Sequence, residues 1–160
     1  MVENSKNLLI KLIFLISVIA LVSAFFIEYV LGHQPCNLCI LERIPYLLAI
    51  IIILLNFKFS HYEKFFILLL SIVFLAGAII SLYHLGIEQS FIQESLVCDL
   101  KSGSNLLSKE EILKQLQEKN VSCKDVTFKI FGFSLTTLNI IISLLITIVF
   151  TKIYFSYDKN

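Results

Sequence analysis

Charged residues are scarce in this chain of 160 residues, and neither sign of charge prevails. Asp, Glu, Lys and Arg make up 16% of the sequence, against about a quarter in soluble domains, and the net charge is +1. There is no basic patch interleaved with aromatic side chains, so nothing indicates a nucleic-acid partner. Internal repeats and low-complexity linkers are also absent. Hydrophobic residues instead make up 58%, which indicates that the chain has a lipid bilayer as its solvent.

Four apolar stretches are long enough to cross a bilayer as helices, which takes about 20 residues each. They cover residues 8–31, 39–57, 65–85 and 130–151. For the first stretch the alternative is a signal peptide cleaved after Ala24, but the apolar run continues past that point. The sequence therefore predicts an all-α membrane protein, a four-helix transmembrane bundle in which residues 1–160 form a single domain.

The long polar segment lies between the third and fourth predicted spans, at residues 86–127. It contains two of the four cysteines, Cys98 and Cys123. Residues 108–119 carry a capping box and one apolar stripe, which predict a short amphipathic helix. Such a helix either lies on the membrane surface or packs its stripe against the rest of this loop.

The orientation in the membrane follows from the cysteines better than from the charges. An even number of spans places both termini on one side, and all four cysteines then lie on the other. The numbers of Lys and Arg on the two sides are nearly equal and do not decide the orientation. Disulfides persist only outside the cytoplasm. We therefore expect an extracytoplasmic loop and cytoplasmic termini.

A Cys-x-x-Cys pair, Cys36 and Cys39, opens the second predicted span just after Pro35. On the first turn of a helix these two cysteines share a face, and the helix N-terminus stabilises a thiolate. Arg43 lies four residues beyond Cys39, so its guanidinium can reach that sulfur or a ligand held against it. An arginine inside the hydrocarbon boundary is costly and indicates function. The alternative is that Arg43 extends toward the lipid headgroups.

The four cysteines allow three interpretations. A tetrahedral zinc site is possible but off pattern, because Cys98 and Cys123 are far apart in sequence. Two structural disulfides explain that loop pair well, but a bond between Cys36 and Cys39 would close too small a loop to stabilise much. Two redox pairs that exchange electrons at the membrane edge are the third interpretation. A quinone fits as their acceptor, since it is apolar and resides in the bilayer.

The motifs of this chain resemble those of the DsbB family, the bacterial inner-membrane disulfide-generating quinone reductases. Residues 36–43 read Cys-Asn-Leu-Cys-Ile-Leu-Glu-Arg and match the family's Cys-x-x-Cys-x-x-Glu-Arg. Residues 83–88 resemble its Tyr-His-x-Gly-x-Glu. Cys98 and Cys123 resemble its two loop cysteines, and residues 131–134 the stretch that enters its fourth helix. The resemblance extends along nearly the whole chain.

This resemblance implies an electron relay. A reduced thioredoxin-fold oxidase of the periplasm, DsbA or a relative, would attack a Cys98–Cys123 disulfide at Cys98. The released Cys123 would attack Cys36 of a Cys36–Cys39 disulfide. Cys39 would be left as a thiolate against a quinone, with Arg43 beside it, and two electrons would end on the quinone.

The same resemblance implies quinone-binding roles for Arg43 and His84, with ubiquinone or menaquinone as the acceptor and no metal ion. For His84 the alternative is an interfacial histidine that faces water. Two positions depart from the family pattern. Phe128 stands where many members have Trp, and Thr136 where a Pro is common.

Two other functions compete with this interpretation. A protein like vitamin K epoxide reductase also joins a quinone to membrane thiols, but there the loop pair of cysteines precedes the Cys-x-x-Cys. Here the order is reversed. A non-catalytic membrane subunit with structural disulfides is the other, and it requires every cysteine to be dispensable for electron transfer.

Overall fold

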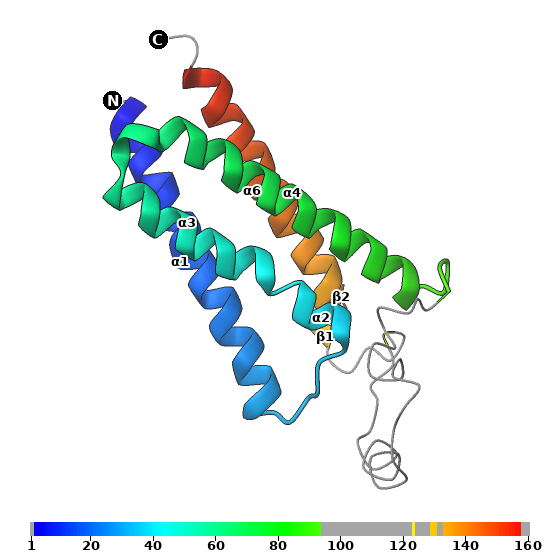
Figure 1. Cartoon of the computed structure of the whole chain (residues 1–160). Coiled ribbons are helices and arrows are strands. Elements are labelled where there is room, and N and C mark those ends of the chain that lie inside the picture. The colour runs from blue at the N-terminus through cyan, green and yellow to red at the C-terminus, as the bar shows by residue number, and fades with distance from the viewer. Residues whose placement is uncertain (1, 94–122, 124–128, 131–132, 158–160) are drawn as a thin grey trace, which may run out of the picture.

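The computed structural model describes residues 2–93, 123, 129–130 and 133–157. Within these residues, four helices are long and apolar enough to cross a membrane, as the sequence predicts. Figure 1 shows that the two ends of the chain lie at the same end of the bundle. The bundle is built from α1 (Val2–Tyr29), α3 (Ile44–Lys58), α4 (Glu63–Glu88) and α6 (Leu135–Tyr157). A short 3₁₀ turn, η1 (Ser60–Tyr62), joins α3 to α4.

The apolar core occupies the half of the bundle that carries the termini. Its fully buried members include Ile10, Ile53, Leu70, Phe74 and Phe150, which come from all four long helices. Large apolar side chains also cover the outside of these helices. Helices that are apolar all round are typical of membrane spans. The other half of the bundle is different, because buried polar side chains lie there beside a smaller apolar cluster.

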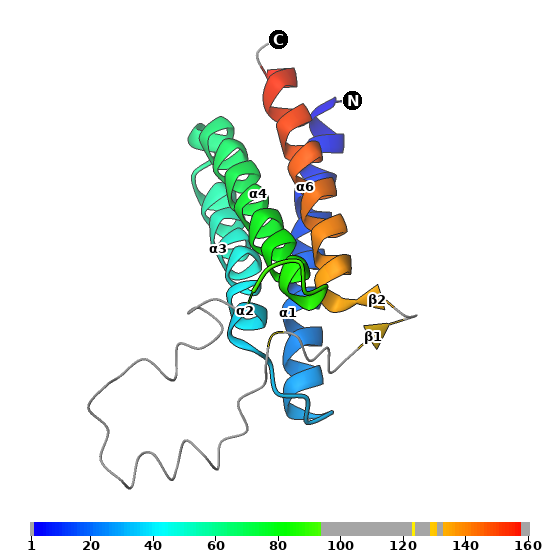
Figure 2. The same cartoon turned by 90° about the vertical axis from the view of Figure 1, so that its right-hand side faces the viewer.

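The second span is divided into two helices, where the sequence predicts one. The short α2 (Asn37–Leu41) ends before α3 begins, and Glu42 and Arg43 form a turn between them. Pro45 explains the break. It has no N–H to donate to the carbonyl four residues earlier, and its ring clashes with that carbonyl. Figure 2 shows α2 and α3 as separate helices. Glu42 and Arg43 therefore lie at a break inside the span.

The ends of the helices also differ from the predicted spans. α1 ends at Tyr29, shortly before Gly32 takes a φ of 71°. α4 continues to Glu88, three residues into the predicted loop. α6 begins at Leu135 rather than 130, because the Ser134 hydroxyl accepts the N–H of Thr136 at 3.1 Å and caps the helix. Residues 130 and 133–134 belong instead to a small hairpin of β1 (Lys129–Ile130) and β2 (Phe133–Ser134).

Most of the predicted long loop lies outside the described residues. This applies to Cys98 and to the amphipathic helix predicted at 108–119. Within the predicted loop the structure describes residues 86–93 and Cys123, and Cys123 is buried.

Small residues on α4 let α3 approach closely. Gly77 and Ala78 are buried where α4 meets its neighbours, whereas Ala76 is exposed on the opposite face. A Cβ atom at Gly77 would lie 2.9 Å from Cγ of Pro45, which is too close for any real contact. The kink at Pro45 therefore packs against a surface that only glycine provides.

Replacing Gly77 by alanine should destabilise the bundle. Overpacking a well-packed interior costs about 1–3 kcal/mol, because backbone or side chains must move. We expect Gly77→Ala to lower the midpoint of thermal unfolding in detergent, while Ala76→Leu, on the exposed face, leaves it near that of the parent. Equal midpoints for Gly77→Ala and the parent would show that the α3–α4 contact is not tight.

Candidate redox site

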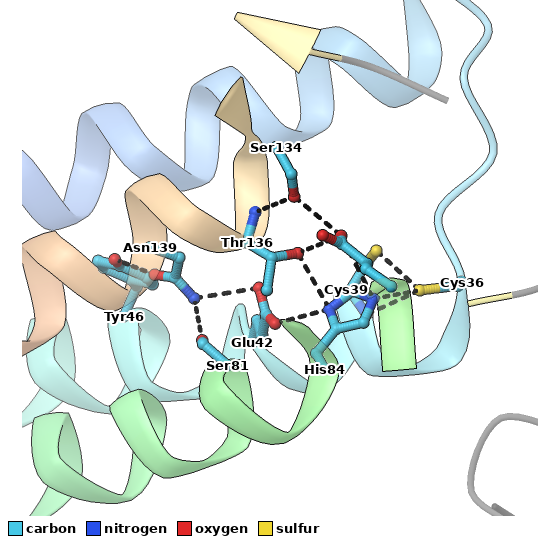
Figure 3. Close-up of polar contacts among 10 residues, drawn as sticks. Cys36, Cys39, Glu42, Tyr46, Ser81, His84, Ser134, Thr136 and Asn139 are labelled. Atoms are coloured by element: carbon cyan, nitrogen blue, oxygen red, sulfur yellow. Dashed lines mark hydrogen bonds and ion pairs between the residues drawn. The ribbon is translucent and has the colours of Figure 1, made fainter. Parts of the chain in front are cut away.

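Cys36 and Cys39 lie together at the start of α2, at the end of the bundle away from the termini. Cys36 is the N-cap residue, and its Sγ accepts the backbone N–H of Cys39 at 3.3 Å. The two Sγ atoms are 2.8 Å apart (Figure 3). The helix start therefore fixes both sulfurs on one face, as the spacing in the sequence predicts.

The surroundings of Cys36 favour its thiolate. The hydrogen bond with the Cys39 side chain lowers the pKa of the Cys36 thiol below its ordinary value. Burial opposes this shift, and the hydrogen bond with His84 adds to it. Thiols of low pKa leave faster in disulfide exchange. Cys36 is therefore a good leaving group in any mixed disulfide that it forms.

Cys123 is packed against this pair. It forms a small buried cluster with Cys36, Leu38 and Ile87, and Cys39 packs against the same cluster. The family resemblance implies this proximity, since it has Cys123 attack Cys36. The structure thus brings one member of the second cysteine pair to the first.

His84 is buried, with 2% of its surface exposed, and so does not face water. It lies near the end of α4 with its ring between the sulfur site and a carboxylate. Its Nε2 is 3.5 Å from Sγ of Cys36, and its Nδ1 is 2.8 Å from Oε1 of Glu42. Figure 3 shows the imidazole bridging these two groups.

Glu42 is a functional candidate that belongs to the motif at residues 36–43, although the motif alone assigned it no role. It is 9% exposed and sits in the turn between α2 and α3. Its Oε2 accepts a hydrogen bond from Nδ2 of Asn139 at 3.1 Å. Asn139 Nδ2 also donates to Ser81, and Tyr46 donates to Asn139 Oδ1. A carboxylate inside an apolar span was the available signal, since such residues are rare and functional.

A second carboxylate approaches the same histidine from one turn further along α4. Oε1 of Glu88 accepts hydrogen bonds from the hydroxyls of Ser134 at 2.8 Å and Thr136 at 2.7 Å. It also lies 4.0 Å from Nε2 of His84. Thr136 Oγ1 is 3.2 Å from Nδ1 of His84 as well. The start of α6 therefore completes the polar shell around His84, with a threonine where the resemblance expects proline.

Arg43 turns toward α1. Its guanidinium forms an ion pair with Glu28, and it lies over the ring of Phe25 at 5.2 Å from the centroid. The side chain is 17% exposed. Arg43 is therefore held by protein groups, and both it and Cys39 line the same cavity.

That cavity has a volume of about 270 Å³ and opens beside the cysteines. Its walls are mostly apolar and come from α1 and α6, including Ala20, Ala24, Leu138 and Ile142. Polar groups also line it, among them Cys39, Arg43 and His84. Apolar walls with a few convergent polar groups are typical of small-molecule sites. The shape suits a ligand with an apolar body and a polar edge.

Comparisons with known proteins agree with this geometry. The family model for disulfide bond formation protein DsbB matches residues 6–153. An uncharacterized protein of Rickettsia prowazekii (strain Madrid E) is 33% identical over 150 residues, which cover 91% of this chain and 85% of the relative. No solved structure matches the chain. Because the family match covers nearly the whole chain, this multi-pass membrane protein belongs to the DsbB family of disulfide bond formation proteins.

Proposed function

We propose that this chain is a membrane thiol:quinone oxidoreductase that reoxidises a DsbA-like dithiol partner. Electrons pass from Cys98 and Cys123 to Cys36 and Cys39, and then to a bound quinone. The observation that carries the proposal is that Cys123 shares a buried cluster with the Cys36–Cys39 pair, and that all three cysteines line one mostly apolar cavity. This arrangement joins a loop cysteine, a helix dithiol and a ligand site.

We place the protein in the bacterial inner membrane, with its termini in the cytoplasm and its cysteines on the periplasmic side. The termini lie at one end of the bundle and α2 lies toward the other (Figure 1). Cys36 caps α2, Cys39 lies within it, and Cys123 belongs to the same buried cluster as Cys36. A periplasmic partner can then reach the loop, and the cavity beside the cysteines remains within the depth of the spans.

The cysteines carry out successive disulfide exchanges. The partner's thiolate attacks Cys98 of the Cys98–Cys123 disulfide, and Cys123 then attacks Cys36, which expels Cys39. When the partner leaves as a disulfide, Cys98 attacks Cys123 and expels Cys36. The partner has then lost two electrons and two protons, which are held by the Cys36–Cys39 pair. Exchange requires good leaving thiols, and the surroundings of Cys36 provide one.

The cavity fits a quinone ring better than a large ligand. Its volume of about 270 Å³ is near the lower end of ligand pockets. Arg43 and His84 would hold the polar edge of the ring, and the apolar residues of α1 and α6 would hold its faces. A bound quinone supplies an acceptor for two electrons and two protons. Arg43 would stabilise negative charge at the polar edge of the ring, and the Glu28 carboxylate would position the guanidinium.

The full-length protein in detergent should reduce ubiquinone or menaquinone when given a reduced DsbA-like partner. Cys98→Ala should abolish turnover with the partner, because the first exchange needs that sulfur. It should leave the Cys36–Cys39 pair oxidisable by quinone, since that pair reaches the cavity directly. Quinone absorbance and gel-shift alkylation of the thiols measure the two steps.

The decisive comparison in this assay is between Cys98→Ala and the parent. Equal turnover by the two proteins would show that the relay order is wrong. Failure of the parent to turn over with either quinone would contradict the oxidoreductase proposal itself. Cys39→Ala provides the matched control, because it should lose turnover and quinone-driven oxidation together.

Arg43→Ala should weaken the use of quinone. A hydrogen bond to a charged group contributes about 1.5–3 kcal/mol, so the KM for quinone should rise about 10-fold to 100-fold. Lys58→Ala, at the far end of α3, serves as the control for loss of a positive charge. An unchanged KM in Arg43→Ala, with the thermal midpoint also unchanged, would assign Arg43 to the Glu28 ion pair alone.

A further inference from the structure

We propose that the reduced form of this protein binds one soft divalent cation, Zn²⁺ or Cd²⁺, through Cys36, Cys39 and His84. The cation would hold the dithiol out of disulfide exchange. The inference concerns the thiol pair and its histidine only, so it does not depend on the identity of the electron acceptor. This site differs from a zinc site built from four cysteines, because its third ligand is His84 of α4 and not a loop cysteine.

The ligand atoms are already close to tetrahedral spacing. The two Sγ atoms and Nε2 of His84 all lie within 4.8 Å of one another. Bond lengths of about 2.3 Å to sulfur and about 2.0 Å to nitrogen separate the ligands of a tetrahedral zinc ion by about 3.5–3.8 Å. The 3.5 Å between Cys36 Sγ and His84 Nε2 meets this requirement. The sulfurs, at 2.8 Å, would have to open by about 1 Å on binding.

A carboxylate that can orient a metal-binding histidine is present as well. Such histidines usually donate their other ring N–H to a carboxylate, which fixes the tautomer and orients the ring. Oε1 of Glu42 lies 2.8 Å from Nδ1 of His84 and provides this partner. Asn139 in turn holds the Glu42 carboxylate. With the proton on Nδ1, the lone pair of Nε2 points at the sulfurs.

Charge balance favours a divalent ion in this site. Two thiolates and a neutral imidazole on a 2+ ion give a complex with no net charge, which suits a buried position. The fourth position is open to a water molecule from the cavity, which leaves the complex neutral. Glu88 stays hydrogen-bonded to Ser134 and Thr136, with Oε1 at 4.0 Å from Nε2 of His84. Binding releases the thiol protons, as metal binding by cysteine does generally.

The redox state of the pair decides whether the cation binds. A Cys36–Cys39 disulfide offers no thiolate, so the oxidised protein should not hold the ion. The reduced protein should hold it, and the bound ion then occupies the sulfur lone pairs that exchange requires. A soft cation would therefore stop the cycle at its reduced stage.

The test titrates the full-length protein in detergent, reduced and free of metal, with Cd²⁺ in the absence of oxygen. The sulfur-to-cadmium charge-transfer absorption should grow and saturate at one Cd²⁺ per chain. After oxidation of the Cys36–Cys39 pair it should not form. A Co²⁺ titration should give the intense visible spectrum of a tetrahedral site with mixed sulfur and nitrogen ligands.

Variants distinguish cation binding at this site from cation binding by the two thiols alone. Cys36→Ser should abolish the cadmium band, and His84→Gln should weaken binding at least 10-fold. Glu42→Gln should weaken it about 10-fold to 100-fold, as loss of an outer-shell partner does. The double variant Cys98→Ser/Cys123→Ser retains all three ligands and should bind like the parent. His61→Gln, at the opposite end of the bundle, is the matched control for loss of a histidine.

Two results would overturn the proposal. One is binding by His84→Gln that equals the parent, which would mean that any Cys-x-x-Cys gives the same signal. The other is loss of binding in Cys98→Ser/Cys123→Ser, which would place the ligands elsewhere. If His84→Gln does not fold, the Co²⁺ spectrum of the parent decides, because a spectrum of sulfur and oxygen ligands alone would exclude the histidine. Each readout is independent of quinone reduction.

Discussion

The redox end of this protein depends on one buried interaction, that between Glu42 and His84. Both side chains are almost fully enclosed, in a bundle whose outer surface is apolar. A carboxylate and an imidazole removed from water are costly unless they are paired and hydrogen-bonded. Their 2.8 Å contact joins the turn between α2 and α3 to α4. Asn139 extends the connection to α6, so three elements are fixed around Cys36.

This interaction exists because the second span is broken. If one continuous helix began at Asn37, Glu42 would be a helical residue near its start instead of lying in a turn. Pro45 instead ends α2 and restarts the chain as α3, and Gly77 lets the proline approach α4 closely. The site therefore rests on two residues that touch neither sulfur.

The sequence predicted the four spans and a dithiol at the start of the second, because long apolar runs and short motifs are local signals. It did not predict the break at Pro45, since proline is tolerated in a first helical turn. Nor did it predict that Thr136 and Glu88 close the shell around His84. Those contacts join residues far apart in the chain, and only packing decides them.

The central claim is that the Cys36–Cys39 pair passes its electrons to a quinone. Its most direct test is to reduce all the thiols of the full-length protein, remove the reductant without oxygen, and add ubiquinone or menaquinone. Mass spectrometry after alkylation then counts the thiols at each cysteine. The account predicts that Cys36 and Cys39 become a disulfide and that one quinone is reduced for every two thiols lost. If Cys36 and Cys39 are still fully alkylated after exposure to either quinone, the pair does not pass its electrons to a quinone.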